Sequence, residues 1–162
     1  MSTRARTTAK HLPTKQRHER SVPAVRALAR VSRVLEAASP DVSLAHYRVL
    51  AAVASGEERA SLVAARLALG KPAVSAAVES LCRRGLLERL DVVADGRAVA
   101  LSITSEGALV LDRVEREMTR RVVDLCSRTS DPDALLDFLA QLGSAMDDLR
   151  AERLAAAQVG GR

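Results

Sequence analysis

The chain has few cysteines, histidines and aromatic residues. Its 162 residues include two cysteines, three histidines, one tyrosine, one phenylalanine and no tryptophan. Cys82 and Cys126 are too few and too isolated for a disulfide framework or a CxxC-type metal site, so we expect two inert, buried thiols. The sequence also lacks a glycine-rich phosphate loop, an HExxH, a GxSxG and a carboxylate pair placed for acid–base work. It therefore predicts no enzyme, no cofactor and no metal site.

Long hydrophobic runs are also missing. A membrane span needs about 18 or more consecutive apolar residues, and no run in this chain approaches that length. The first residues are polar and basic, without the apolar stretch of a secretion signal. With 48% hydrophobic and 28% charged residues, the chain falls in the range of one globular domain. We expect a cytoplasmic protein that does not contact a membrane.

Charge is distributed unevenly along the chain. Residues 1–30 contain eight lysines and arginines and a single acid, Glu19, whereas residues 105–153 contain seven arginines and eleven acids. A basic end and an acidic end indicate a polyanionic partner on one side only. Two interpretations of the first 20 or so residues stay open, because a basic disordered tail either contacts DNA or is merely solvated.

Apolar spacing predicts three helices in the first half of the chain. An apolar 3–4 spacing that opens at Pro23 and ends at Ser39 predicts the first helix. Ser43 suits the N-cap of a second helix over residues 44–54, because its hydroxyl can accept a hydrogen bond from the first turn. A short third helix is predicted over residues 61–68.

A fourth helix and a hairpin follow. Gly70 breaks the apolar pattern, and Pro72 is tolerated in the first turn of a new helix that runs to residue 84. Gly85 then stands where a left-handed helix cap is favoured. Two alternating runs, 86–93 and 98–104, flank an Asp-Gly turn, which is a strong hairpin signal. Two helices joined by a tight break and followed by a hairpin are typical of a winged helix-turn-helix.

Two long amphipathic helices complete the chain. Apolar residues between positions 111 and 125 recur every three or four residues, and residues 130–133 have the capping-box arrangement that begins another such helix. Packing within one chain is the ordinary use of such faces, but the scarcity of aromatics favours packing against a partner chain. The predicted fold is mainly α with a small β-hairpin wing: a winged helix-turn-helix domain with long N- and C-terminal dimerisation helices.

The fourth helix is predicted to have a core face and a DNA face. At about 100° per residue, Val74, Ala77, Val78 and Leu81 converge on one side of this helix. The residues on the other side are predicted to face DNA, and they are Pro72, Ser75, Ala76, Glu79 and Arg83. Lys71, at the helix start, suits a phosphate or a guanine edge. For any one of these residues, a solvated surface position is the alternative.

Two segments of the sequence resemble the MarR family of bacterial multiple-antibiotic-resistance-type regulators. Residues 95–107 are similar to the family's D-x-R wing and the L-T-x-x-G start of its next helix. Residues 71–89 are similar to its recognition-helix stretch, and the whole resemblance covers about residues 22–154. The resemblance implies a homodimer joined through the first and last two helices, an operator DNA, and often a small phenolic or lipophilic effector.

The same resemblance implies roles for single residues. Arg97 would be the wing arginine in the minor groove, Asp95 its orienting carboxylate, and Ser75 and Lys71 would contact DNA from the recognition helix. Ala76 departs from the family pattern, in which an arginine or another polar residue is common. Base contacts are then fewer, or they come from Glu79, Arg83 or the tail.

The family's effector pocket forms near the second helix of this fold. His46, Tyr47 and Arg48 lie on that helix and are the candidates for effector contacts, although Tyr47 also fits a core position. Gly70 replaces the usual serine cap of the recognition helix. No cysteine lies near the first helix, where the redox-sensing branch of the family places one.

Five segments are predicted along the chain. They are a basic, disordered tail (1–21), a first dimerisation helix (22–42), the winged helix-turn-helix (43–104), the C-terminal dimerisation helices (105–154) and a disordered tail (155–162). We predict a sequence-specific double-stranded DNA-binding transcriptional regulator, a homodimeric repressor that a small molecule releases. The alternative is a winged-helix dimer that docks on a protein without binding specific DNA.

Overall fold

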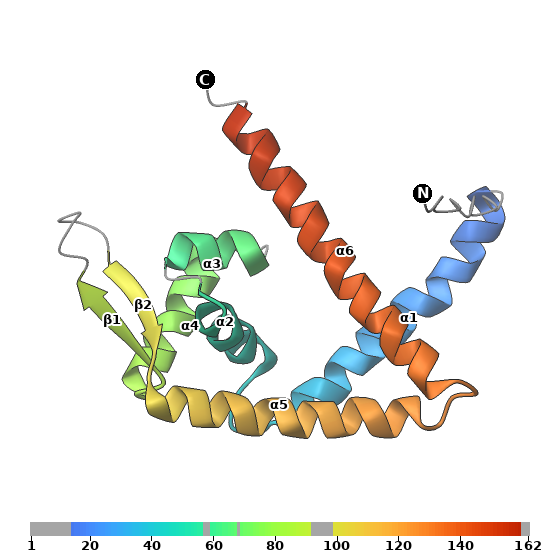
Figure 1. The fold of residues 1–162 in the computed structure, drawn as a ribbon, viewed down its shortest axis with the longest axis horizontal. Helices are drawn as coiled ribbons and strands as arrows, with labels where there is room; N and C mark the ends of the chain where they lie inside the picture. Colours follow the sequence, from blue (N-terminus) through green and yellow to red (C-terminus); the bar gives the residue numbers. More distant parts are fainter. Residues whose placement is uncertain (1–13, 57–58, 68, 92–98, 160–162) are drawn as a thin grey trace, which may run out of the picture. The chain divides into compact units, whose positions relative to one another are not determined.

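The computed structural model describes residues 14–56, 59–67, 69–91 and 99–159 of the chain. Within these residues it contains six helices and one two-stranded sheet (Figure 1). In chain order the elements are α1 (Thr14–Ala38), α2 (Leu44–Ala54), α3 (Ala60–Leu67), α4 (Lys71–Arg83), β1 (Leu87–Asp91), β2 (Val99–Ile103), α5 (Ser105–Cys126) and α6 (Pro132–Val159). The predicted fold class, mainly α with a small β-hairpin, is confirmed.

The chain divides into two compact units, Met1–Val34 and Leu35–Arg162. Most of α1 belongs to the first unit, and this helix begins at Thr14, whereas the sequence predicted a tail through residue 21 and a helix from Pro23. Pro23 therefore lies inside α1, where it cannot donate the backbone hydrogen bond to the carbonyl of Glu19. At the other end of the chain, α6 continues to Val159 and so includes residues predicted to form a disordered tail.

The core of the second unit consists mainly of aliphatic side chains from α2 to α5, from both strands and from the segment just before α2. Its largest fully buried members are Val42, Val49, Leu50, Val63, Val74, Val78, Leu81 and Leu87. The two aromatic residues do not form its centre, because Tyr47 is half-buried and Phe138 is 65% exposed. Burying one valine or leucine contributes about 1.5–3 kcal/mol, so contacts among these short helices stabilise the winged-helix part of the chain.

Local backbone and capping preferences explain where α2 begins and where α4 ends. The Oγ atom of Ser43 accepts a hydrogen bond from the backbone N–H of His46 at 3.2 Å, which confirms the predicted N-cap of α2. Gly85 has a φ of +70°, a conformation that L side chains rarely adopt. Leu86 N–H then donates to the carbonyl of Leu81 at 3.0 Å. The chain thus turns out of α4 directly into β1.

The two strands form the base of the predicted wing. They pair antiparallel, with Leu87 opposite Ile103 and Asp91 opposite Val99. Leu87 and Leu101 share one face of the hairpin and are both buried, so this face packs on the core. The hairpin tip, residues 92–98, lies outside the described residues.

Thr104 joins the end of α4, the hairpin and α5. Its Oγ1 atom accepts a hydrogen bond from Gly107 N–H at 3.0 Å and donates one to the carbonyl of Gly85 at 2.7 Å. Its own N–H donates to the carbonyl of Leu86 at 3.2 Å. Gly107 approaches Leu86 so closely that an added Cβ would lie 2.0 Å from the Leu86 carbonyl oxygen. We call Gly85, Leu86, Thr104 and Gly107 the wing junction.

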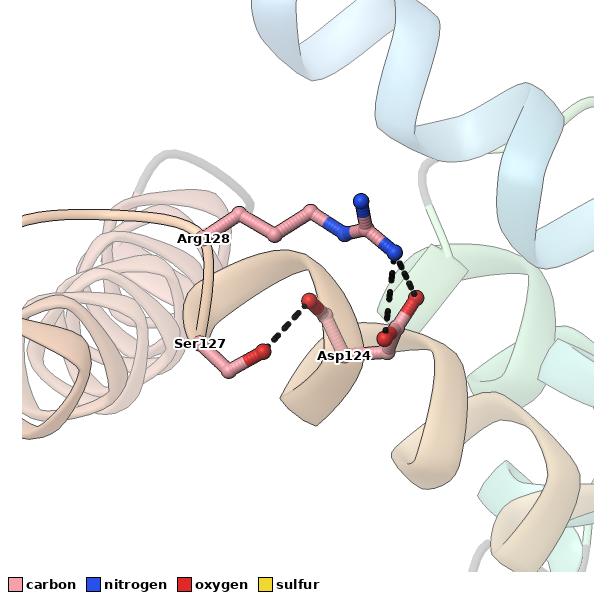
Figure 2. A network of polar contacts seen from close by, with 3 residues as sticks. All are labelled: Asp124, Ser127 and Arg128. Atoms are coloured by element: carbon pink, nitrogen blue, oxygen red, sulfur yellow. Dashed lines mark hydrogen bonds and ion pairs between the residues drawn. The ribbon is translucent and has the colours of Figure 1, made fainter.

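Hydrogen bonds also define the turn between α5 and α6. Figure 2 shows Ser127 Oγ donating to the carbonyl of Asp124 at 2.8 Å and the Arg128 guanidinium reaching the Asp124 carboxylate at 3.5 Å. Farther along the turn, Asp131 Oδ1 accepts a hydrogen bond from Ala134 N–H at 3.1 Å. The predicted helix start at residues 130–133 is confirmed, and Asp131 supplies the cap.

The last helix leaves its apolar stripe uncovered in a single chain. On α5, the first part of the predicted stripe is core, since Leu111, Val114 and Met118 are buried. On α6, Leu139 and Leu142 are 39% and 46% exposed. The exposed large apolar residues of α6, which we call the α6 stripe, are Phe138, Leu139, Leu142, Met146 and Leu149.

The two cysteines are free thiols in different surroundings. Cys126, at the end of α5, is buried as expected. Cys82, on α4, is only half-buried. The expectation of a buried thiol therefore holds fully for Cys126 and in part for Cys82.

No single helix in the described ranges is both long enough and apolar enough to span a membrane. Within those ranges, α3 and α4 together have the length and composition of a membrane span, but the pair is bent by 120° at the break between the helices. Val63 and Val74, one from each helix of this pair, belong to the core of the second unit.

Gly107→Ala should destabilise the protein by at least about 2 kcal/mol, because a methyl group at this position cannot coexist with the Leu86 carbonyl in the observed backbone. Gly143→Ala is the matched control, since an added Cβ at this position of α6 meets nothing within 4 Å. That control should leave stability unchanged or raise it by up to about 1 kcal/mol. Urea unfolding followed by circular dichroism measures both changes, and equal stabilities of the two variants would contradict the described wing junction.

Candidate nucleic-acid interface

Helix α4 has one buried face and one exposed face. Val74, Val78 and Leu81 are at most 2% exposed, and Ala77 packs against the same core. The residues predicted to face DNA, Pro72, Ser75, Ala76, Glu79 and Arg83, lie away from this core face and are exposed, and Lys71 is exposed at the start of the helix. We call these six residues the α4 outer face.

The N-terminal end of α4 carries positive charge without a side-chain cap. Gly70 is the N-cap residue and offers only its carbonyl, which accepts hydrogen bonds from Ala73 N–H at 3.0 Å and Val74 N–H at 3.2 Å. The amide groups of a first helical turn carry a partial positive charge, and exposed Lys71 adds a full one. An anion such as a backbone phosphate is the group that this end favours.

The C-terminal half of the α4 outer face carries an ion pair. Arg83 Nη1 donates a hydrogen bond to Glu79 Oε1 at 2.8 Å, and the two side chains are 66% and 63% exposed. The pair has the i,i+4 spacing that brings side chains together on one helix face. The next residue, Arg84, points elsewhere: its guanidinium donates to the backbone carbonyl of Asp41 at 2.9 Å. Arg84 therefore ties the end of α4 to the segment between α1 and α2.

The two predicted wing residues lie outside the part of the chain that the structure describes. Asp95 and Arg97 belong to residues 92–98, outside the described part of the chain. The strands that would present them are in place, and β1 carries exposed Glu88 and Arg89. Arg89 adds a basic side chain to this hairpin.

A cavity of about 480 Å³ lies beside Tyr47, between α2, α5 and the start of α6. Its lining is mostly aliphatic and consists of Leu35, Tyr47, Glu115, Met118, Thr119, Val122, Val123 and Leu136. Burial raises the pKa of Tyr47, and the nearby Glu115 raises it further through its negative charge and a hydrogen bond to the Tyr47 side chain. A cavity of this size and polarity can hold a small, largely apolar molecule.

Only one of the three predicted effector residues lines this cavity. His46 lies instead at the cap of α2, where its Nδ1 atom is 3.1 Å from Ser43 Oγ. Burial lowers the pKa of His46, and the positive charge of Arg84 lowers it further. Arg48 is exposed and is absent from the cavity lining. The structure thus brings Tyr47 together with Glu115, and it separates His46 and Arg48 from them.

Sequence reasoning did not single out Glu115, Arg84 or Asp41. Glu115 meets Tyr47 across two helices, and Arg84 reaches Asp41 over 43 positions of sequence. No periodicity links residues so far apart. The only signal in the sequence was that Glu115 lies beside apolar positions of a predicted helix. A solvated helix face shows the same pattern.

Comparison with known proteins agrees with this geometry. Residues 41–98 match the model of the MarR family. This match lies over the predicted winged helix-turn-helix, so that part of the chain is similar to the DNA-binding part of the MarR family, in agreement with the predicted resemblance. The match supports a DNA-binding transcription regulator and is consistent with the expectation of no enzyme. No curated protein sequence matches the chain.

Solved structures share the fold. The repressor CouR, solved bound to a 23-mer DNA duplex, is 22% identical with a TM-score of 0.69 over 84% of this chain and 99% of that one. Wild-type MarR from E. coli in its apo form is 22% identical with a TM-score of 0.64, over 82% of this chain and 97% of that one. The regulator PcaV from Streptomyces coelicolor, solved with its natural ligand, is 26% identical with a TM-score of 0.56, over 85% and 97% of the two chains.

The lowered pKa of His46 predicts a loss of stability in mild acid. Above its ordinary pKa of about 6.5, the imidazole is neutral in both the folded and the unfolded chain and adds no pH dependence. As the pH falls below that value, the unfolded chain binds the proton more readily than the folded one, so stability decreases.

Urea unfolding at about pH 7.5 and about pH 5.5 measures this decrease. His46→Gln should show a smaller loss of stability than the wild type over that interval. His18→Gln, which removes an exposed histidine of α1, is the matched control and should keep the wild-type loss. A loss as large in His46→Gln as in the wild type would show that other groups are responsible.

Proposed function

We propose that the chain is a sequence-specific, double-stranded DNA-binding repressor that acts as a homodimer. The α4 outer face carries this proposal. It offers Lys71, Ser75 and Arg83 on a helix whose opposite face is fixed in the core. A helix with this division fits a major groove, where base edges accept and donate hydrogen bonds. The MarR-family match over residues 41–98 supports the same function.

A second copy of the chain is the proposed cover of the α6 stripe. Its members include Phe138 at 65% and Met146 at 66% exposure, and apolar surface of this kind in a soluble protein marks an interaction site. We propose that α1, α5 and α6 form the dimer interface, corresponding to segments 22–42 and 105–154. A two-fold dimer presents two recognition helices to two half-sites.

The wing and the N-terminal tail are proposed to add contacts outside the major groove. In this proposal Arg97 enters the minor groove, oriented by Asp95, where a narrow A·T-rich groove concentrates negative potential. The first 20 residues, which include the start of α1 and six lysines and arginines, contact phosphates in this proposal without reading bases. Pro72 and Ala76 contribute close apolar contact to bases, because neither carries a polar side-chain atom.

A small lipophilic ligand is proposed to bind in the cavity beside Tyr47 and to release the DNA. The cavity meets both α2, the first helix of the DNA-binding part, and the α5–α6 pair, so a ligand there contacts the elements proposed to set the distance between two recognition helices. PcaV, whose fold this chain shares, was solved with its natural ligand. The Tyr47 and Thr119 hydroxyls and the Glu115 carboxylate are the polar side-chain groups that line the cavity and can orient a ligand.

DNA binding is tested with a duplex that the wild-type protein selects from a random-sequence pool, and with a shuffled duplex of the same composition. Arg97→Ala should weaken binding to the selected duplex by ~1–3 kcal/mol, with the loss felt at A·T-rich flanks. Ser75→Ala should weaken binding mainly to the selected duplex, whereas deletion of residues 1–20 should weaken both equally and flatten the salt dependence.

Fluorescence anisotropy at two salt concentrations gives all of these affinities. Equal, salt-independent binding of the selected and shuffled duplexes would favour the alternative, a winged-helix dimer that docks on a protein. Arg97→Ala binding like the wild type at the same salt would show that the wing arginine does not enter the minor groove.

The dimer is tested by placing one charge on or off the α6 stripe. Light scattering of the wild type at micromolar concentration should give twice the chain mass of 17.3 kDa. Leu142→Asp puts a carboxylate in the stripe and should give a single-chain mass or an aggregate, because an unpaired charge is costly to bury. Ser144→Asp, on the opposite face of the same helix, should stay dimeric. A monomeric wild type would contradict the proposed assembly.

A further inference from the structure

Glu79 occupies an unexpected place on the α4 outer face. About 160° around the helix axis separate it from buried Leu81, so it lies near the middle of the face proposed to meet DNA. It is the only acid between Lys71 and Arg83. A carboxylate there faces phosphates of like charge and weakens the general attraction of the helix to DNA.

The helix gains little stability from Glu79. Its ion pair with Arg83 has an N···O distance of 2.8 Å, but both side chains are largely exposed. Exposed pairs of this kind contribute little, because water and salt screen them. The pair matters more for Arg83, because a contact between its guanidinium and a phosphate competes with the Glu79 carboxylate.

Glu79 and Arg83 supply the polar side-chain groups in the middle of the α4 outer face. Pro72 and Ala76 share its stripe, and neither has a side-chain hydrogen-bond donor or acceptor. Base edges opposite the centre of α4 therefore meet Glu79 and Arg83, with Ser75 to one side. A carboxylate that loses its water at such an interface needs a donor from the DNA.

Among the four bases, cytosine supplies that donor most cleanly. Guanine and thymine present only acceptors on their major-groove edges, and the amino group of adenine lies beside the N7 acceptor, which repels a carboxylate. Cytosine presents its N4 amino group alone, and a guanine presents the O6 and N7 pair that suits an arginine fork.

We propose that Glu79 determines the base specificity of α4 by accepting a hydrogen bond from the N4 amino group of a cytosine. Held by the same carboxylate, Arg83 is oriented toward O6 and N7 of an adjacent guanine. Opposite guanine or thymine Glu79 loses water without gaining a donor, and opposite adenine the donor lies beside a repelling acceptor, so these bases are penalised. This inference rests on the proposed DNA-binding function.

The test repeats the selection from a random-sequence pool with three proteins. The wild type should enrich a half-site that contains cytosine at one position. Glu79→Gln should shift that position toward adenine, because an amide pairs with adenine N6 and N7. The same variant should bind a shuffled duplex about threefold to tenfold more tightly than the wild type, since one repelling charge is gone and Arg83 is released.

Asp112→Asn is the matched control. It removes one carboxylate from an exposed i,i+4 ion pair with Arg116 on α5, and it should select the wild-type sequence. An unchanged cytosine preference in Glu79→Gln, with shuffled-duplex affinity equal to that of the wild type, would overturn the inference while leaving the proposed function standing. A wild-type protein that enriches no sequence would instead overturn the proposed function, and the inference with it.

Discussion

The contact between Gly107 and the Leu86 carbonyl is the constraint on which the DNA-binding part of the chain depends. It brings the start of α5 against the residue that follows the left-handed turn at Gly85, and Thr104 secures the approach with hydrogen bonds to both sides. Three elements meet there: the proposed recognition helix α4, the hairpin and the long helix α5, which leads toward the proposed dimer interface. Backbone contacts therefore fix the direction of α4 relative to α5, and none of these contacts uses a side chain of the α4 outer face.

Packing beyond this junction divides the second unit into a closed part and an open part. Short aliphatic side chains such as Val63 and Val78 close the core around α2, α3 and α4. The chain then has few large apolar residues left, and those of α6, Phe138 among them, remain exposed. The winged-helix part of this chain is therefore packed within one chain, whereas the α6 stripe is left for the proposed second copy to cover. A ligand in the cavity beside Tyr47 would act on the boundary between these two parts.

Local patterns predicted most of the fold, and contacts between distant residues were beyond them. Ser43, Gly85 and the Asp-Gly turn mark helix and hairpin limits because capping and turn preferences act over a few residues. The outward position of Ser75 and Arg83 followed from helical periodicity alone. The start of α1 was missed, because Pro23 reads as a first-turn residue and the structure continues the helix back to Thr14. The pairing of Tyr47 with Glu115 could not be predicted either, since it depends on how α2 packs on α5.

The central claim is that two copies of this chain present two α4 helices to one duplex. Hydroxyl-radical footprinting of the wild-type protein on the duplex it selects tests the claim most directly, because the cleavage pattern reports the spacing of the bound helices. The account predicts two protected half-sites on one face of the DNA, with centres about one helical turn or a multiple of it apart. A single protected segment, or uniform protection that follows no sequence, would contradict it.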